Sequence, residues 1–389
     1  MNLNEIQRAI REEGLDGWLF FDHHQRDPLA YRILGLSTKN IVSRRWYYFI
    51  PANGEPRKLV HKIESYGLDG LPGEKVAYAG WAQQKQELAG MLAGARRVAM
   101  QYSPECAVMH VALVDAGTIE NVRSLGAEVV SSANLVQYFE ARLNQAQLES
   151  HLEAGKLVDE IRRGAFRYIG DGIRSGSPVS EWQTQTFIKE QFARNGLFTD
   201  HGPNVSANAN ASNPHYEPTA EASATIKAGD KVLIDLWAKF DRPDAIYYDI
   251  TWVGFCGNDP PSAFQNVFEV VREARDRAVK RVQNSISAGD VLCGFQVDDA
   301  ARDYIREQGF GDAFFHRTGH SIGTEVHGAG ANMDNLETHD ERRVIPWTCF
   351  SVEPGIYLKD FGVRLEVNVF VEDNSARVTG EIQREIVRI

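Results

Sequence analysis

Acidic residues interrupt several of the most apolar stretches of this sequence, and any fold must give each of them a partner. Asp235 follows the apolar run 232–234, Val-Leu-Ile, which is typical of a buried strand. A carboxylate there needs a cation or several hydrogen bonds, because an isolated buried charge is costly. Asp249 lies in a second strand-like run, IYYDITW. The segment 241–244, Asp-Arg-Pro-Asp, predicts a turn between the two runs, so a hairpin would place the two aspartates side by side. Taken singly, either aspartate fits a strand-end cap or an arginine pair equally well.

Two glutamates occur in similar surroundings nearer the C-terminus. Glu353 lies in the segment SVEPGIY, where Pro354 favours an extended conformation at Glu353 and Gly355 permits a sharp turn. Glu366 follows Arg364 by two residues in a strand pattern, which predicts that both side chains lie on one face. A solvated ion pair between Arg364 and Glu366 is the alternative interpretation for the second glutamate.

Three histidines lie close together in the segment HRTGHSIGTEVHG. They are His316, His320 and His327, with spacings of four and seven. Residues four apart share a face in a helix or a strand, and neutral imidazole is the commonest metal-ligating side chain. Structural histidines, in the core or at the surface, are the alternative.

Together these residues favour a two-metal site. Four carboxylates and one imidazole exceed what a tetrahedral zinc ion needs, and oxygen-rich ligation favours harder ions such as manganese. Two divalent cations would balance the four carboxylate charges, and such a pair can activate a shared water. The predicted ligands are Asp235, Asp249, His320, Glu353 and Glu366.

The chain divides into two predicted domains, 1–143 and 144–389. The first alternates helical and strand patterns, with strands at 17–21, 46–51 and 97–100, and is interpreted as an α/β domain. The second begins with a long helix capped by Asn144 and ending at Gly170, and a second helix capped by Ser180. Helices at 262–285 and 296–308 follow, with strands at 232–240, 245–255, 349–358 and 363–373. Two helices followed by strands, twice over, predict an α+β fold of two similar halves.

The overall composition excludes several classes of protein. The net charge is −11 and no basic stripe interrupts it, so we expect no nucleic-acid partner. No apolar run approaches the ~18 residues of a membrane span. The four cysteines form no CxxC pair, which fits a reducing compartment. We therefore expect a cytoplasmic protein without a membrane segment.

The ordered residues Asp235, Asp249-Ile-Thr, His320, Glu353-Pro-Gly and Arg364-x-Glu366 resemble the pita-bread metallopeptidases. This family includes Xaa-Pro dipeptidases (prolidases), Xaa-Pro aminopeptidases, methionine aminopeptidases and the metal-free creatinase. The resemblance implies a pita-bread C-terminal domain, an N-terminal creatinase-like α/β domain and a homodimer. It also implies two divalent metal ions, with manganese favoured and cobalt or zinc possible.

Residue roles follow from the same resemblance. It implies that Glu353 is both a ligand and the general base, that His327 and His215 contact the substrate, and that His316 and Arg364 support the ligands from behind. Trp237 stands where relatives usually have glycine, and so bears on substrate size. The expected activity is hydrolysis of Xaa-Pro dipeptides. The alternatives are an Xaa-Pro aminopeptidase acting on longer peptides, a creatinase-like hydrolase or lyase, and a non-catalytic binding module.

Overall fold

The computed structural model describes residues 2–389, which form two compact units. The first unit ends at Glu140 and the second begins at Ala141, close to the predicted boundary after residue 143. None of the helices in residues 2–389 is long and apolar enough to cross a membrane.

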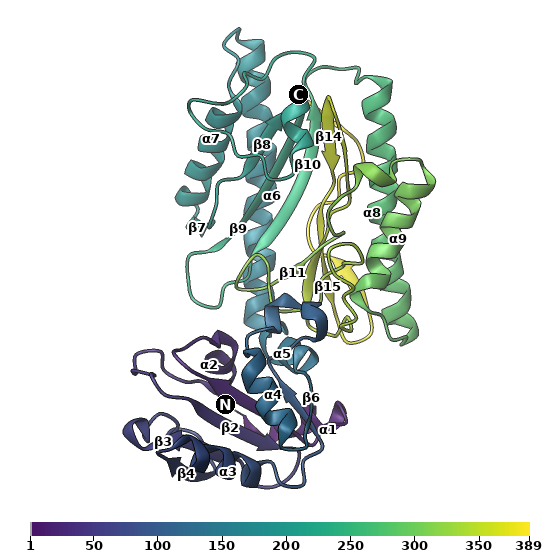
Figure 1. Cartoon of the computed structure of the whole chain (residues 1–389). Coiled ribbons are helices and arrows are strands. Elements are labelled where there is room, and N and C mark those ends of the chain that lie inside the picture. The colour runs from purple at the N-terminus through teal and green to yellow at the C-terminus, as the bar shows by residue number, and fades with distance from the viewer. Residues whose placement is uncertain (1) are drawn as a thin grey trace. The chain divides into compact units, whose positions relative to one another are not determined.

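The N-terminal unit is a mixed six-stranded sheet covered by helices (Figure 1). The strand order is β4 (Glu74–Tyr78), β3 (Arg57–His61), β2 (Trp46–Pro51), β1 (Gly17–Asp22), β5 (Arg97–Met100) and β6 (Glu128–Ser131). The helices are α1 (Leu3–Glu12), α2 (Pro28–Leu34), α3 (Trp81–Met91), α4 (Ala116–Ser124) and α5 (Ala133–Glu140). Every residue of β1 is buried, so both faces of the sheet are covered. The α/β prediction for this region and its three predicted strands are confirmed.

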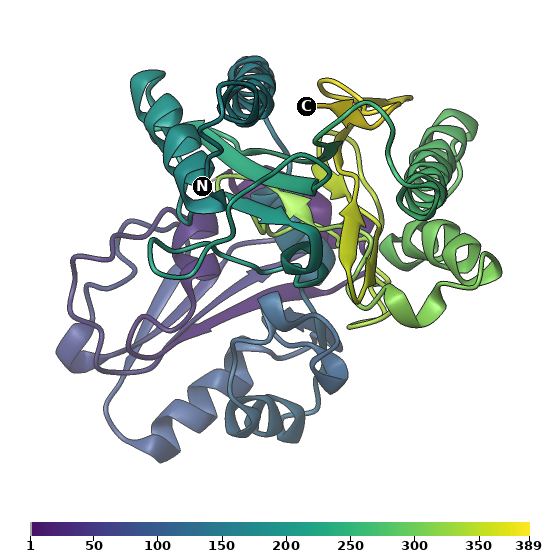
Figure 2. The same ribbon diagram turned by 90° about the horizontal axis from the view of Figure 1, so that it is seen from above.

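The C-terminal unit places two pairs of helices outside a layer of curved sheets. Helices α6 (Gln145–Arg174) and α7 (Glu181–Arg194) pack together on one side, and α8 (Ser262–Ala288) and α9 (Gly294–Glu307) on the other. Figure 2 shows the strands between these two pairs. The arrangement is the predicted α+β class.

Two sheets and a hairpin make up the inner layer of this unit. The first sheet has the order β17 (Val387–Arg388), β10 (Tyr248–Phe255), β9 (Lys231–Phe240) and β7 (Leu197–Phe198), with β8 (Asn204–Ala207) also paired to β9. The second has the order β11 (Ser321–Ile322), β12 (Cys349–Val352), β15 (Val367–Val371) and β16 (Ala376–Val378). Strands β13 (Gly355–Leu358) and β14 (Phe361–Arg364) form the hairpin.

Alternation along β9 and β10 directs apolar side chains to one face and acidic ones to the other. Ile234, Leu236 and Ile250 belong to the apolar core under α6 and α7. Asp235 and Asp249 occupy the intervening positions and so face away from that core. The other large core lies between the second sheet and α8 and α9.

The long helix α6 begins as predicted but ends later. Asn144 accepts a hydrogen bond from the backbone of Gln147, whose side chain bonds back to Asn144, so the predicted N-cap is confirmed. The predicted stop at Gly170 is wrong, because the helix continues to Arg174. A glycine inside a helix costs only about 1 kcal/mol, and the buried face of α6 outweighs that cost.

Two predicted strands are each broken into two. The pattern at 349–358 forms β12 and β13, because Pro354 has no N–H to donate and the backbone N–H of Glu353 bonds to the Thr318 carbonyl instead. The pattern at 363–373 forms β14 and β15, because the N–H of Glu366 leaves the ladder and bonds to the Thr251 carbonyl. Both breaks occur at predicted metal ligands.

Candidate metal centre

The hairpin of β9 and β10 carries the two aspartates on one face. Its register pairs Asp235 with Thr251 and Asp249 with Trp237. The predicted hairpin and its turn are therefore present, but the aspartates are offset diagonally by two residues instead of lying directly opposite. Both face the second sheet, where the remaining candidate ligands lie.

His320 and Glu353 are held together by Ser351 of β12. The Ser351 hydroxyl accepts a hydrogen bond from the His320 backbone N–H at 2.9 Å and donates one to Oε1 of Glu353 at 3.1 Å. This close approach requires glycine at position 319, since a Cβ there would lie 1.9 Å from the Ser351 carbonyl oxygen. His316 and His320 lie in irregular chain before β11, so the argument that they share a face was wrong.

Glu366 lies in the break between β14 and β15 and is fully enclosed by protein. Its Oε2 accepts a hydrogen bond from the Thr251 hydroxyl at 2.8 Å, and Thr251 in turn accepts one from Nε of Arg364 at 3.1 Å. The prediction that Arg364 and Glu366 share one strand was wrong, although both side chains reach the same cluster through Thr251.

The structure brings all five predicted ligands into one acidic cluster. Ligand atoms of Asp249, His320 and Glu366 all lie within 4.8 Å of one another. Nε2 of His320 is 3.4 Å from Glu353 Oε1 and 3.6 Å from Asp249 Oδ2. Arg364 links the fifth predicted ligand, Asp235, to the others. Its Nη2 donates to Asp235 Oδ2 at 2.5 Å, and its Nε lies 3.7 Å from Glu353 Oε2.

The cluster contains more negative charge than its protein surroundings neutralise. Asp249 Oδ1 and Glu366 Oε1 are buried, and no hydrogen-bond donor within residues 2–389 reaches either atom. Burial, followed by the neighbouring carboxylates, raises the pKa of Glu366 well above its usual value, and burial raises that of Asp249 to about 7. Unpartnered buried carboxylate oxygens beside an imidazole are a donor set that fits divalent cations.

His320 is oriented for a ligand by its other ring nitrogen. Nδ1 lies 3.2 Å from the Ser321 carbonyl oxygen and donates to it, so Nε2 is the ring nitrogen that faces the carboxylates. Burial would lower the pKa of His320, but Asp249 and Glu353 raise it, so Nε2 is protonated in the absence of a cation and would give up that proton to bind one. Such an orienting hydrogen bond is the usual partner of a metal-binding histidine.

Arg364 also connects the cluster to His316 through a tyrosine. Nη1 of Arg364 donates to the Tyr357 hydroxyl at 2.9 Å, which lies 2.7 Å from His316 Nε2. Burial lowers the pKa of His316 to about 4, so the ring is neutral, and its Nδ1 donates to the Arg317 carbonyl at 2.7 Å. Tyr357 therefore donates its own proton to His316, which is linked to Arg364 through this hydroxyl.

The three remaining candidates lie in different surroundings. His327 is exposed, and its ring centroid is 4.4 Å from that of His320. Trp237 is half-buried on the face of β9 that carries Asp235, and its indole N–H donates to Asp200 at 2.7 Å. His215 is exposed in the loop after the 3₁₀ helix η4 (Asn208–Ser212), and no hydrogen bond or ion pair within residues 2–389 joins it to the cluster.

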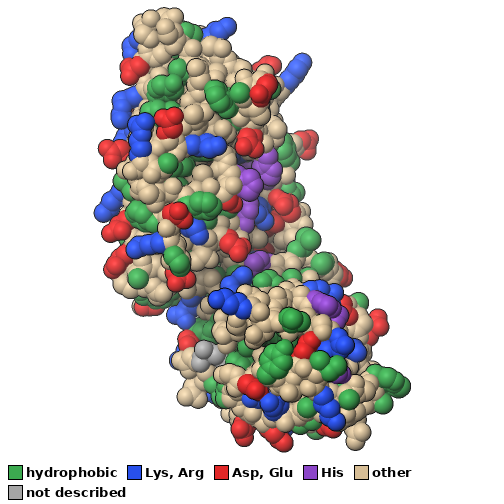
Figure 3. Space-filling view, turned by 90° about the vertical axis from the view of Figure 1, so that its left-hand side faces the viewer, with side chains coloured by type: hydrophobic (Ala, Val, Ile, Leu, Met, Phe, Trp, Pro, Cys, Tyr) green, Lys and Arg blue, Asp and Glu red, His purple; other side chains and the backbone are tan. Residues whose placement is uncertain are grey.

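Figure 3 shows several histidine side chains gathered on one face of the C-terminal unit, with acidic side chains beside them.

Sequence reasoning missed the residues that organise the ligands, namely Thr251, Ser351 and Tyr357. Alternation along β10 offered a signal for Thr251, since it must share a face with Asp249. No comparable signal identified Ser351, because its role depends on the path of the chain around Gly319.

The sequence matches the model of metallopeptidase family M24 over residues 149–373, more than half of the chain. The chain belongs to metallopeptidase family M24. The matched region contains every residue of the acidic cluster.

Curated relatives and solved structures agree with this family. The chain is 26 % identical over 289 residues to an Xaa-Pro dipeptidase of Pyrococcus furiosus, an alignment that covers 69 % of this chain and 77 % of that enzyme. Other relatives, named as Xaa-Pro dipeptidases or putative Xaa-Pro aminopeptidases, are matched over only 50–62 % of their own length.

Two solved structures share the fold of the whole chain. Dipeptidase PepE from Mycobacterium ulcerans superposes with a TM-score of 0.68 at 22 % identity, covering 100 % of this chain and 96 % of that one. An X-prolyl aminopeptidase from Caenorhabditis elegans, described as a cytosolic enzyme with a di-nuclear active site, has a TM-score of 0.63 at 15 % identity, covering 99 % and 62 %. The predicted pita-bread fold is confirmed.

Proposed function

We propose that this metallopeptidase uses two divalent cations, manganese foremost, to hydrolyse Xaa-Pro dipeptides. The observation that carries the proposal is the convergence of four carboxylates and one imidazole with two buried oxygen atoms left unpartnered. The preference for proline rests on the names of the relatives and on no side chain of this chain.

Asp235, Asp249, His320, Glu353 and Glu366 would hold the two cations. When bound, the cations supply a water activated as a nucleophile near neutral pH and positive charge that stabilises the developing oxyanion. Four carboxylate charges balance two divalent cations, which removes the excess negative charge of the cluster. The C. elegans relative with a di-nuclear site supports this stoichiometry.

Glu353 is the side chain best suited to move the proton. Burial tends to raise the pKa of Glu353, but the positive charge around it, led by His320, outweighs burial and lowers it. Bound cations would replace the charge of His320 and keep the carboxylate ionised, so Glu353 can accept a proton from the attacking water. It then returns this proton to the imide nitrogen of proline, a poor leaving group unless protonated.

His327 lies where it can donate to the substrate carbonyl. The charge of neighbouring His320, together with burial of part of the ring, holds the pKa of His327 well below its usual value, so the ring is neutral near pH 7. A neutral imidazole N–H beside the cluster can stabilise an oxyanion. The role of His215 stays a prediction from the family resemblance.

Trp237 favours a dipeptidase over an aminopeptidase. The indole stands opposite Asp249 in the hairpin and is fixed by its hydrogen bond to Asp200. A bulky, fixed side chain beside the ligands restricts the room for residues beyond proline. A panel of Xaa-Pro, Xaa-Pro-Yaa and Xaa-Ala peptides tests this, and cleavage of only the longer peptides would favour the aminopeptidase.

The base is tested by Glu353→Gln, with Glu341→Gln as the matched control because the side chain of Glu341 is 80 % exposed. We expect the first variant to lose at least ~10²-fold in kcat, the typical share of a general base, and the control to keep full activity. Metal content measured alongside separates loss of the base from loss of a ligand. Undiminished activity in Glu353→Gln would refute the mechanism.

We further propose that the protein is cytoplasmic and forms a homodimer. All four cysteines are unpaired, as expected in a reducing compartment. Analytical ultracentrifugation of the metal-loaded protein tests the dimer.

A further inference from the structure

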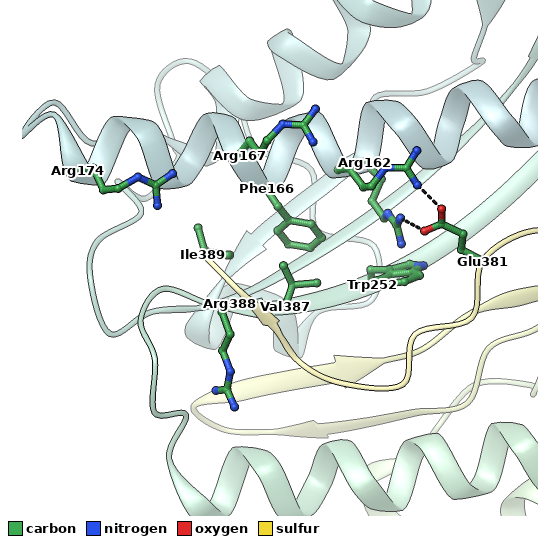
Figure 4. Close-up of a pocket in the computed structure, with 10 residues that line it drawn as sticks. Arg162, Phe166, Arg167, Arg174, Trp252, Glu381, Val387, Arg388 and Ile389 are labelled. Carbon is green, nitrogen blue, oxygen red and sulfur yellow. Dashed lines mark hydrogen bonds and ion pairs between the residues drawn. The ribbon is translucent and has the colours of Figure 1, made fainter.

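A basic pocket lies on the reverse face of β10, away from the acidic cluster. Helix α6, β10 and the C-terminal strand β17 enclose a cavity of about 320 Å³ (Figure 4). Trp252 forms part of its wall and follows Thr251 directly in the chain. Successive residues of a strand point to opposite faces, so Thr251 faces Glu366 while Trp252 faces this pocket.

The pocket contains hydrogen-bond donors that the protein leaves unused. Arg162 is only 1 % exposed, and its Nη2 bonds to Glu381 at 2.6 Å. Its Nε and Nη1, and the indole Nε1 of Trp252, are buried and have no partner within residues 2–389. Buried donors are almost always paired, because an unpaired one costs the full desolvation of that group. These three nitrogen atoms therefore call for an acceptor that the described chain does not provide.

The charge of the residues that line the pocket also favours an anionic ligand. Five arginines and one glutamate line the cavity, in a protein whose net charge is −11. The glutamate, Glu381, already pairs with Arg162 and Arg163, and the exposed Arg174 pairs with Asp171 on the surface. Neither Arg167 nor Arg388 has a carboxylate partner among residues 2–389. Concentrated positive charge in a concave site attracts anions.

The spacing along α6 leaves room between these charges. Arg163, Arg167 and Arg174 fall at i, i+4 and i+11, so they follow one stripe of the helix. Gly170 occupies the i+7 position and contributes no side chain there. The guanidinium of Arg174 lies over this gap, where a Cβ on Gly170 would come within 2.8 Å of its Nη2. The last turns of α6 thus place a row of guanidinium groups along one rim of the pocket.

One wall of the pocket is apolar and aromatic. The guanidinium of Arg162 lies 3.4 Å from the centroid of the Trp252 ring, and Phe166, Val387 and Ile389 complete the surface (Figure 4). Stacking against an indole fixes the plane of the guanidinium. A ligand that fills this space would have an anionic end and an apolar body.

We propose that this pocket binds a small organic oxyanion, a phosphate or a carboxylate joined to an aromatic or aliphatic group. The oxygen atoms accept from Arg162 and Trp252 and from the guanidinium groups of Arg163 and Arg167 on the same helix, since guanidinium forks match oxyanions in shape and charge. The apolar body packs on Phe166 and Val387. This site is separate from the metal cluster and does not depend on the peptidase proposal.

The experiment uses the zinc-loaded full-length protein, because zinc is diamagnetic. Phenyl phosphate and benzoate serve as the two oxyanion probes and benzylammonium as the cationic control. The readout is the indole ¹⁵N–¹H signal of Trp252, assigned with Trp252→Phe. We expect this signal to shift with saturation by one or both oxyanions and to stay fixed with benzylammonium.

Variants at the rim locate the binding site. Both Arg163 and Arg167 are exposed, so the double variant Arg163→Gln/Arg167→Gln is expected to fold, and Arg281→Gln on α8 is the matched exposed control. We expect the double variant to weaken binding about tenfold, as for loss of charge-assisted hydrogen bonds, and the control to bind as the wild type does. An unmoved Trp252 signal with both oxyanions, an equal response to benzylammonium, or unchanged binding by the double variant would overturn the proposal.

Discussion

Substitution of Thr251 tests directly whether a side-chain hydroxyl positions the candidate metal ligand Glu366. Thr251 is 0 % exposed, and its hydroxyl donates to Glu366 at 2.8 Å while accepting from Arg364 at 3.1 Å. Replacing it with valine keeps the shape of the side chain and removes both hydrogen bonds. Water has no access to replace them, and the other carboxylate oxygen of Glu366 already lacks a donor.

A hydrogen bond to a charged group contributes about 1.5–3 kcal/mol. Thr251→Val removes this contribution to the position of Glu366. We expect the affinity of the variant protein for Mn²⁺ to fall roughly 10- to 100-fold, the range found when supporting partners of metal ligands are removed. Thr251→Ser, which keeps the hydroxyl, is the matched control and should retain most of the affinity. Competition with a chromogenic chelator measures the affinity of each form.

The predicted order of Mn²⁺ affinity is therefore wild type, then Thr251→Ser, then Thr251→Val. A valine variant that binds Mn²⁺ as tightly as the serine variant would refute the reasoning. In that case Glu366 would be positioned by backbone packing alone, and the hydroxyl would be incidental.

Four further outcomes follow from the structure. Burial lowers the pKa of His151 to about 4, so the unfolded chain binds the proton more readily. This histidine contributes about 3 kcal/mol of stability that is fully present above about pH 6.5 and lost as the pH falls towards 4; His151→Gln should flatten that part of the urea-unfolding profile, and an unchanged profile would exclude the assignment. Gly319→Ala would place a Cβ 1.9 Å from the Ser351 carbonyl, an overpacking that costs about 2 kcal/mol and lowers Tm by roughly 4–8 °C in calorimetry; an unaltered Tm would mean that the chain yields there without strain. Chelation should lower Tm and Mn²⁺ should restore it, since ligand at 1,000 times its Kd stabilises by about 4 kcal/mol; a Tm indifferent to metal would count against the centre. Trp237→Gly should raise kcat/KM for Xaa-Pro-Yaa relative to Xaa-Pro by about tenfold, and a constant ratio would remove Trp237 from substrate selection.

Several elements could be predicted from the sequence because their signals are local. The N-cap at Asn144 depends only on residues within one helical turn. The structure shows the cap, together with a capping box between Asn144 and Gln147. Strand β2 and strand β5 have the predicted bounds because each is a short apolar run between polar residues. Gly170 shows the opposite case, since its stop signal was overridden by packing along the rest of α6.

The acidic cluster could be predicted from the sequence for a different reason. A buried carboxylate inside an apolar run is costly in any fold, so Asp235 and Asp249 each require a partner whatever the tertiary structure. The family resemblance supplied the order of the five ligands, and the fold brings all five together.

The tertiary structure alone decided how those ligands are held and what lies behind them. The breaks at Glu353 and Glu366 arise because their backbone N–H groups bond to Thr318 and Thr251, which are distant in the sequence. No local pattern encodes such partners. The unused donors of Arg162 and Trp252 likewise became visible only when α6 and β10 were placed together. The sequence determined which charges must be buried, and the three-dimensional fold determined which of them are neutralised and which are left for a ligand.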